Sequence, residues 1–207
     1  MSAEVDRAAD QRLLDATLAY VAKHPDSKLD GFRDAVANWG HDWTGIAPVH
    51  LTASDLLAEA LALTKPATGE QELMDHYVRE RASRYWEQSY TSADKAVGDD
   101  MLTYYGYTEI VGKRGPFISE RVRAGIGVFG ANVNYPAHRH AAEEIYVILA
   151  GSADFRLGEG AGPERRTAGD VINIPSMLTH GFRMTDEPLV IFYLWQGGDL
   201  REKSSFV

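Results

Sequence analysis

The segment Gly130–Gly151 reads G-A-N-V-N-Y-P-A-H-R-H-A-A-E-E-I-Y-V-I-L-A-G and carries His138, His140, Glu144 and Tyr146 in a strongly strand-like run. Side chains of a strand alternate between its two faces, so His138 and His140 are predicted to share one face. Glu144 and Tyr146 share a face for the same reason. Two imidazoles and a carboxylate that converge on one point form a site for a divalent first-row metal.

A second segment supplies a further imidazole. It runs from Gly169 to His180 and reads G-D-V-I-N-I-P-S-M-L-T-H, so that His180 follows a buried-looking strand and a Pro turn. The two segments together offer three His and one Glu, and thiolate ligation is excluded because the chain has no Cys. Such a set of nitrogen and oxygen ligands accepts Fe, Mn, Zn, Ni or Co, and the sequence leaves the identity of the metal open.

The spacing of these residues resembles the two motifs of the cupin superfamily. The first motif has H-x-H, three or four residues, Glu, six residues and Gly, which matches His138, His140, Glu144 and Gly151. The resemblance implies a mainly β fold, with a C-terminal cupin domain that forms a jelly-roll β-barrel. It also implies that His138, His140, Glu144 and His180 bind one divalent metal.

The second motif departs from the cupin pattern at one position. The family has Gly, five residues, Pro-x-Gly, two residues and His. Here the segment begins at Gly169, passes through Pro175-Ser176-Met177 and ends at His180. Met177 stands where the family usually has Gly, so the turn there is expected to differ.

Composition limits the function classes. The net charge of −9 argues against a nucleic-acid partner, since phosphates need a basic surface. Without Cys there is no disulfide framework. The polar, acidic N-terminus lacks the features of a signal peptide, and no apolar run reaches the ~18 residues of a membrane span. The sequence therefore predicts a soluble, cytoplasmic protein without a membrane partner, and leaves open whether it is a monomer or a homodimer.

Hydrophobic periodicity divides the chain into a helical region, 1–97, and a strand-rich region, 98–207. The resemblance implies that the second region is the cupin barrel, with the helical region packed on it. Strand formers and Gly/Pro turns begin at about Met101, and the tail from Gly197 to Val207 is predicted to be peripheral. Helices are predicted over 4–24, 29–39, 56–63 and 69–90. Between them, 40–48 is predicted as a loop in which His41 and Asp42 are turn residues. Strands are predicted over 145–149, 153–157, 171–174, 179–184 and 189–195.

Aromatic residues cluster near the predicted metal site. Tyr146 is two residues after Glu144 on the same face, and Tyr135 is three residues before His138. Tyr193 and Trp195 share a face of the last long strand. Each aromatic could serve only to fill the barrel, but four of them beside a metal are more typical of a pocket lining.

This wider pattern resembles the cupin-type dimethylsulfoniopropionate (DMSP) lyases of the DddL, DddQ and DddW group. The resemblance rests on Y-P-A-H-R-H, A-E-E-I-Y and L-A-G and covers 135–195. Members of the group vary at the position of Glu144, where some carry His. The resemblance implies a carbon–sulfur lyase that acts on a small sulfonium carboxylate and releases acrylate and dimethyl sulfide by β-elimination.

The same resemblance suggests roles for the aromatic residues. The metal would hold the substrate carboxylate as a Lewis acid, and Tyr146 would remove the α-proton, with Tyr135 as the rival base. Trp195, Tyr193 or Tyr135 would face the sulfonium through a cation–π contact. Two alternatives remain open at this point: an Fe-dependent cupin dioxygenase, which would consume O₂, and a non-catalytic cupin that binds a small ligand.

Overall fold

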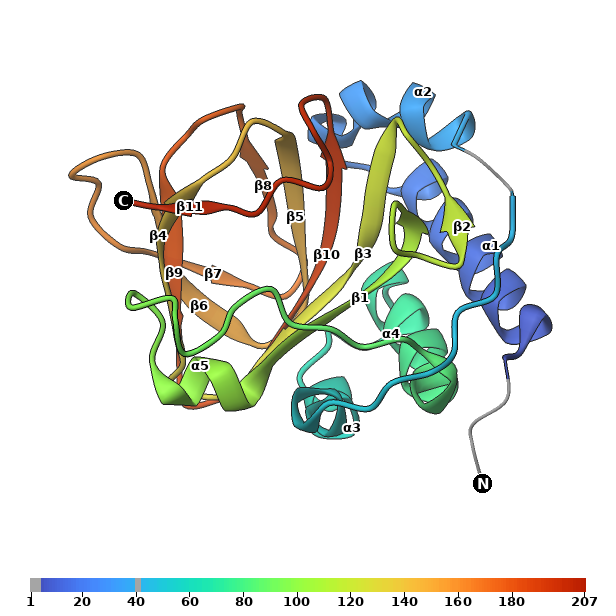
Figure 1. Cartoon of the computed structure of the whole chain (residues 1–207), viewed down its shortest axis with the longest axis horizontal. Coiled ribbons are helices and arrows are strands. Elements are labelled where there is room, and N and C mark those ends of the chain that lie inside the picture. The colour runs from blue at the N-terminus through green and yellow to red at the C-terminus, as the bar shows by residue number, and fades with distance from the viewer. Residues whose placement is uncertain (1–4, 40–41) are drawn as a thin grey trace.

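The structure, a computed structural model, describes residues 5–39 and 42–207 (Figure 1). The predicted loop residues Gly40 and His41 lie outside these ranges. Helices dominate the first part of the chain, as predicted. The α-helices are α1 (Arg7–Lys23), α2 (Asp30–Ala37), α3 (Leu57–Leu61), α4 (Gly69–Glu80) and α5 (Asp99–Tyr104). Short 3₁₀ turns cover Ser27–Leu29, Thr52–Leu56 and Arg81–Ser83.

Side-chain caps fix where the two longest helices begin. The Asp6 carboxylate accepts hydrogen bonds from the amides of Ala8 and Ala9 at the start of α1, at 2.9 and 3.0 Å. Thr68 serves as the N-cap of α4. These bonds satisfy amides that have no partner within the first turn of a helix, and the helices begin there for that reason.

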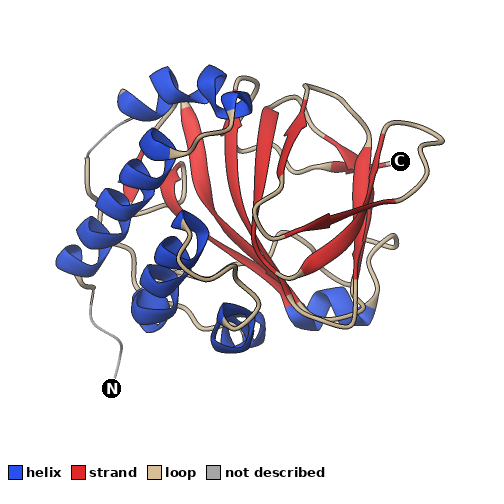
Figure 2. Cartoon of the chain, turned by 180° about the vertical axis from the view of Figure 1, so that it is seen from behind, coloured by secondary structure: helices blue, strands red, loops and turns tan. Residues whose placement is uncertain are grey.

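Two β-sheets face each other in the second part of the chain (Figure 2). The strands are β1 (Tyr105–Gly112), β2 (Phe117–Ile118), β3 (Val122–Phe129), β4 (Asn134–Arg139), β5 (Glu143–Ala150), β6 (Ser152–Leu157), β7 (Glu164–Thr167), β8 (Val171–Ile174), β9 (His180–Met184), β10 (Leu189–Gln196) and β11 (Ser205–Phe206). The six-stranded sheet has the order β2-β1-β3-β10-β5-β8, and the five-stranded sheet has the order β11-β4-β9-β6-β7. The predicted architecture of a cupin barrel preceded by helices is confirmed.

The six-stranded sheet is buried on both faces. On β10, Phe192 and Leu194 pack with residues of α1–α4 in one hydrophobic core. Ile191 and Tyr193 point the other way and belong to a second core between the two sheets. Figure 1 shows helices α1–α4 lying against the side of this sheet that faces away from the barrel. Because both faces are covered, β10 is a continuous apolar run rather than an alternating one.

Two helix boundaries differ from the prediction. The helix predicted over 69–90 ends at Glu80 with one 3₁₀ turn after it, and the chain then runs extended. Bridges from Tyr85 to Val49 and from Glu87 to Tyr107 tie this extended stretch to other segments. Tertiary pairing thus overrides local helix propensity. Conversely, residues 103 and 104, predicted as strand formers, belong to the short helix α5.

The tail, predicted to be peripheral, is mostly exposed but is also part of the barrel. Strand β11 pairs with β4, and in that register Phe206 lies opposite His138. Nearby, Lys203 forms an ion pair with Asp94 at 2.7 Å. Leu200 is buried. The tail therefore completes the five-stranded sheet beside the predicted metal ligands.

Candidate metal centre and aromatic cavity

The four predicted ligands come together between the two sheets. His138 lies on β4, His140 directly follows that strand, Glu144 lies on β5, and His180 begins β9. All four side chains are buried, and ring nitrogens of the three histidines lie within 4.8 Å of one another. Across the β4–β9 pair, His138 is directly opposite His180. The fold thus joins the two sequence motifs at one point.

Main-chain carbonyls orient all three imidazoles. Each Nδ1 lies within hydrogen-bond distance of a carbonyl oxygen two residues away in the chain. The pairs are His138 with Pro136 at 2.8 Å, His140 with Ala142 at 2.9 Å, and His180 with Leu178 at 2.9 Å. A carbonyl only accepts, so each Nδ1 carries a proton and each Nε2 is the nitrogen left for a metal. This is the arrangement that a metal-ligating histidine needs. At His140 burial by itself would lower the pKa, but the nearby carboxylate of Glu144 raises it, so a metal ion bound at this Nε2 would displace a proton.

Glu144 faces the same point. One carboxylate oxygen, Oε2, lies 3.0 Å from Nε2 of His140 and 3.5 Å from Nε2 of His180. Its other oxygen accepts a hydrogen bond from the indole of Trp195. Burial by itself would raise the pKa of Glu144, but its contacts with His140 and His180 lower it to about 2. The carboxylate is therefore ionised at neutral pH.

Two observations indicate that these residues fit a divalent ion. Burial is the main cause that lowers the pKa of His138 to about 3, so this imidazole stays neutral, as a ligand must be. The Nε2 of His180 is buried and has no hydrogen-bond partner among the described residues. A buried nitrogen without a partner is costly unless something binds it, and a metal ion would do so.

Tyr135 reaches the site because β4 is irregular. The β4–β9 register shifts between Tyr135 and His138, which inserts one extra residue and brings both side chains to the same side. Their rings stack with centroids 4.2 Å apart. The Tyr135 hydroxyl bonds to that of Tyr90 at 2.7 Å. Tyr90 was missed in the sequence because it falls in the stretch predicted as the end of a helix.

Tyr146 lies on β5, two residues after Glu144, with its ring centroid 6.2 Å from that of His180. Its direct neighbour on β10 is Tyr193. Burial and the charge of Glu144 raise the pKa of Tyr146 well above 10. Without a positive charge nearby this phenol stays protonated, whereas a cation at the histidine cluster would favour the phenolate.

A narrow cavity of about 50 Å³ lies beside the histidine cluster and reaches it at Glu144. The residues that line it include Tyr90, Tyr135, Glu144, Tyr146, Tyr193 and Trp195. Charged residues that the sequence did not suggest also line it, namely Arg123 on β3 and, in the C-terminal tail, Glu202 and Lys203. All the aromatic residues predicted to form the pocket therefore border one cavity.

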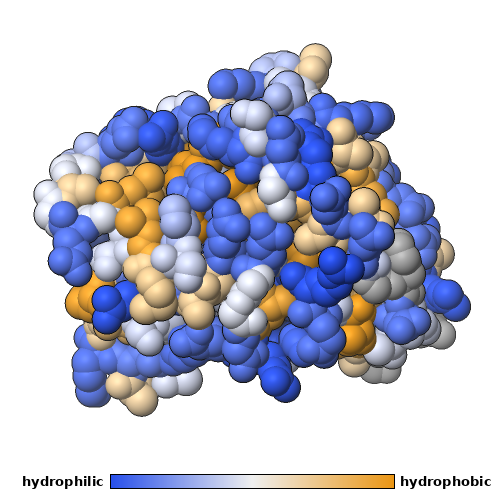
Figure 3. All heavy atoms as spheres, turned by 90° about the horizontal axis from the view of Figure 1, so that it is seen from above, coloured by the Kyte–Doolittle hydropathy of each residue, from blue (hydrophilic) through white to orange (hydrophobic). Residues whose placement is uncertain are grey.

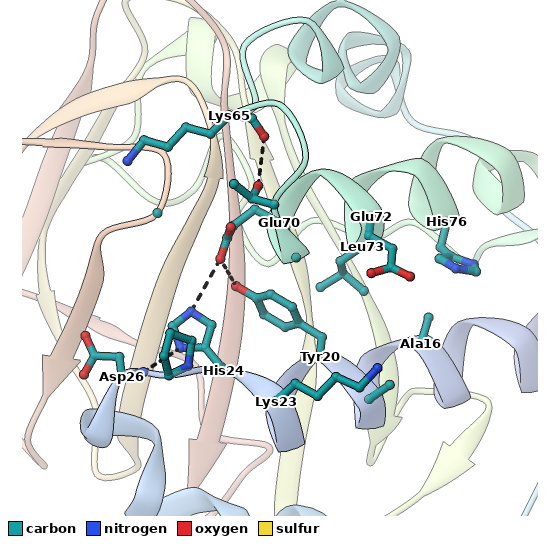
Figure 4. Close-up of a pocket in the computed structure, with 15 residues that line it drawn as sticks. Ala16, Tyr20, Lys23, His24, Asp26, Lys65, Glu70, Glu72, Leu73 and His76 are labelled. Carbon is teal, nitrogen blue, oxygen red and sulfur yellow. Dashed lines mark hydrogen bonds and ion pairs between the residues drawn. The ribbon is translucent and has the colours of Figure 1, made fainter.

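A larger hollow lies elsewhere, between α1 and α4, and measures about 760 Å³. Figure 4 shows Glu70 pointing from α4 toward Tyr20 and His24 at the end of α1. Its carboxylate accepts a bond from the Tyr20 hydroxyl at 2.9 Å and lies 3.4 Å from Nε2 of His24. Because these groups already partner one another and the histidine cluster is on the other side of the sheet, we assign the chemistry to the smaller cavity.

The surface seen in Figure 3 mixes hydrophilic and apolar side chains. In Figure 3 apolar side chains lie between hydrophilic ones rather than covering the face that is seen. No helix among the described residues combines the length and the apolar character that a membrane span needs.

Comparison with known proteins gives consistent results. Residues 47–191 match the family model described as dimethylsulfoniopropionate lyase. The chain is 33% identical over 152 residues to dimethylsulfoniopropionate lyase DddQ of Ruegeria pomeroyi, and the match covers 73% of each chain. The crystal structure of DddQ from that organism superposes with a TM-score of 0.84, at 30% identity and over 98% of both chains.

Proposed function

The chain belongs to the dimethylsulfoniopropionate lyase family, and from this premise we propose that it is a metal-dependent carbon–sulfur lyase that cleaves DMSP to acrylate and dimethyl sulfide. The observation that carries the proposal is that Tyr146 lies beside a buried cluster of three His and one Glu in an aromatic cavity. The substrate is accordingly a small sulfonium carboxylate.

The proposed ligands are His138, His140, Glu144 and His180, with each histidine binding through Nε2. A divalent ion held by them would act as a Lewis acid and supply positive charge beside Tyr146. The donor set accepts Fe, Mn, Zn, Ni or Co.

Tyr146 is the proposed general base. As phenolate it takes the α-proton of the substrate, the electron pair of that C–H bond forms the double bond of acrylate, and the β-carbon–sulfur bond breaks. Dimethyl sulfide leaves with the electrons of that bond and so becomes neutral. Tyr135 is the rival base. Its hydroxyl already bonds to that of Tyr90, which favours Tyr146 as the base.

Tyr135, Tyr193 and Trp195 are the proposed substrate contacts. The Arg123 guanidinium lies 5.7 Å from the ring centroid of Tyr193 and 5.1 Å from that of Trp195. A second cation at those rings would meet like charge, so Tyr135 is the favoured partner of the sulfonium. Such a contact is worth roughly 0.5–2 kcal/mol.

The helical region 1–97 and the barrel 98–207 are proposed to act as one unit. Ser89 and Tyr90 come from the first region and line the cavity of the second. On this proposal the barrel alone would have an incomplete pocket.

The test is incubation of the metal-loaded protein with DMSP and detection of dimethyl sulfide in the headspace, with and without O₂. Equal release of dimethyl sulfide under both conditions supports the lyase. Consumption of O₂ coupled to turnover would instead identify a dioxygenase. Binding of DMSP without any product would identify a binding protein.

A further inference from the structure

We propose that Arg123 and Tyr193 form a carboxylate-binding subsite in the cavity, and that the substrate carboxylate is held there rather than by the metal. The inference deepens the proposed function and rests on it for the identity of the substrate. It rests on two observations: the Tyr193 hydroxyl has no hydrogen-bond partner among the described residues, and the ion pair of the neighbouring Arg123 with Glu109 engages its Nε.

The Tyr193 hydroxyl is buried and has no hydrogen-bond partner among the described residues. The residue is only 6% exposed and lines the cavity. A buried hydroxyl that bonds to nothing costs free energy, so a site that retains one is a candidate for binding a ligand. Since a hydroxyl donates one hydrogen bond, a carboxylate oxygen is a suitable acceptor.

Arg123 is placed beside Tyr193 by the strand register. On β3 it lies directly opposite Trp195 of β10, so its side chain faces the barrel interior as the indole does. The guanidinium carbon lies 4.9 Å from the ring centroid of Tyr107 and 5.7 Å from that of Tyr193. Stacking on these rings holds the planar group in a fixed position at the cavity wall.

Only part of the guanidinium is used by the protein. Glu109, the one anionic partner of Arg123 in the described part of the chain, contacts it at Nε. The second oxygen of Glu109 accepts a hydrogen bond from the Arg114 amide at 3.0 Å. The ion pair with Glu109 engages Nε, which leaves the terminal N–H groups, the fork that fits a carboxylate, as the donors for a ligand.

This subsite orients the substrate for elimination. Tyr193 and Tyr146 are direct neighbours across the β10–β5 pair. A carboxylate held at Tyr193 would therefore bring the adjoining α-carbon next to the proposed base. The sulfonium, repelled by Arg123, would point toward Tyr135. The ammonium of Lys203 lies 4.9 Å from the ring centroid of the neighbouring Tyr90, but its charge is paired with Asp94 at 2.7 Å. Each charge of the substrate then meets a suitable environment.

Binding to the metal-free protein tests this assignment. The probes are propionate, which has only the carboxylate, and trimethylsulfonium, which has only the cation. Their affinities are measured by ligand-observed NMR for wild type, Tyr193→Phe and Arg123→Lys. We expect Tyr193→Phe to weaken propionate about tenfold, the usual effect of losing one hydrogen bond to a charged group. Trimethylsulfonium should change less than about twofold.

Thr108→Val is the matched control, because the Thr108 hydroxyl is also buried and without a partner but lies outside the cavity. It should change neither affinity. If Arg123→Lys disturbs the fold by leaving Glu109 without its partner, a melting curve will reveal this. The propionate affinity of Tyr193→Phe alone then tests the subsite. Propionate affinity that is unchanged in Tyr193→Phe, or that exists only after metal is added, would overturn the subsite. Neither result bears on whether DMSP is cleaved, which the headspace measurement decides separately.

Discussion

Trp195 donates its indole N–H to Oε1 of Glu144, directly across the β10–β5 pair. Its ring also stacks on that of His140, with centroids 4.2 Å apart and planes 28° from parallel. One residue therefore positions two proposed metal ligands. This contact gives Trp195 a role beside the substrate contact predicted for it, since it fixes the carboxylate before any ligand arrives.

Trp195→Phe should weaken metal binding. The variant keeps a ring against His140 but removes the donor to Glu144, and loss of such an outer contact typically lowers metal affinity about 10–100-fold. Titration with Zn²⁺ against a competing chelator measures the change. The matched control is Trp86→Phe, because the Trp86 indole bonds to the Arg81 carbonyl in the helical layer, far from the ligands. Equal affinities for Trp195→Phe and wild type would remove Trp195 from the metal centre.

His140→Ala and His180→Ala should each lower the metal stoichiometry in the same titration. Their folds should persist, because the core between the sheets is formed by apolar side chains as well as by the ligands.

Tyr146→Phe should retain its fold and its metal yet lose about 10²–10⁴-fold in turnover of DMSP, the usual effect of removing a general base. Solvent exchange of the substrate α-hydrogen in D₂O, if wild type shows it, should disappear too. Tyr104→Phe is the control, since Tyr104 is exposed on α5. Should Tyr146→Phe turn over normally while Tyr135→Phe is inactive, the roles of the two tyrosines are reversed. Normal turnover in both would exclude a tyrosine base.

Met177→Gly should stabilise the protein. Met177 has φ of 63°, a left-handed conformation that strains any residue with a side chain, and its side chain is exposed, so little packing is lost. Replacing Met177 by Gly relieves this backbone strain, but Gly also loses more conformational entropy on folding. The net result is an expected increase of roughly 0.5–1 kcal/mol in the free energy of unfolding, measured by urea titration. Ala161→Gly, at a loop position without positive φ, should not stabilise. A loss of stability in Met177→Gly would show that the turn needs its methionine.

Glu70→Gln should reduce the dependence of stability on acid. Its contact with His24 is the main cause that lowers the pKa of Glu70 to about 2, below its value in the unfolded chain. Because the pKa of Glu70 is lower in the folded than in the unfolded protein, its carboxylate stabilises the fold above about pH 4.5. This contribution is lost as the pH falls toward 2. The difference in urea midpoint between wild type and variant should therefore be larger at pH 5.5 than at pH 3.5. Glu72→Gln, exposed on the same turn of α4, should show almost no difference at either pH. A difference independent of pH would contradict the assignment.

The sequence predicted most of what depends on spacing within one strand. The H-x-H pattern and Glu144 predicted side chains that would converge, because a period of two determines which side chains share a face, and the fold brings them together with His180. Met177, in place of the family's Gly, was expected to make the turn differ, and that expectation stays a prediction. Its φ of 63° lies in the left-handed region that Gly favours. The barrel followed from several short strands with Gly and Pro between them.

Features that depend on contacts between distant segments escaped prediction. Tyr90 reaches Tyr135 because the chain after α4 runs extended, which local propensity did not indicate. Arg123 occupies the cavity because β3 lies beside β10, and no motif surrounds it. The tail looked peripheral because it is polar, yet Phe206 pairs opposite His138. Each of these relationships depends on which segments lie side by side in the fold. The hydrophobic periodicity of one segment does not indicate which other segment it will pair with.

The three carbonyl bonds to Nδ1 have a consequence for how this centre tolerates sequence change. A point mutation can delete a side chain but not a main-chain oxygen, so no single substitution removes the acceptor that orients His138, His140 or His180. Glu144 is different, because the donor to its carboxylate is the side chain of Trp195, which a single substitution can remove. A substitution at Trp195 therefore removes a hydrogen bond from the carboxylate, whereas the carbonyl acceptors of the three imidazoles persist whatever side chains surround them.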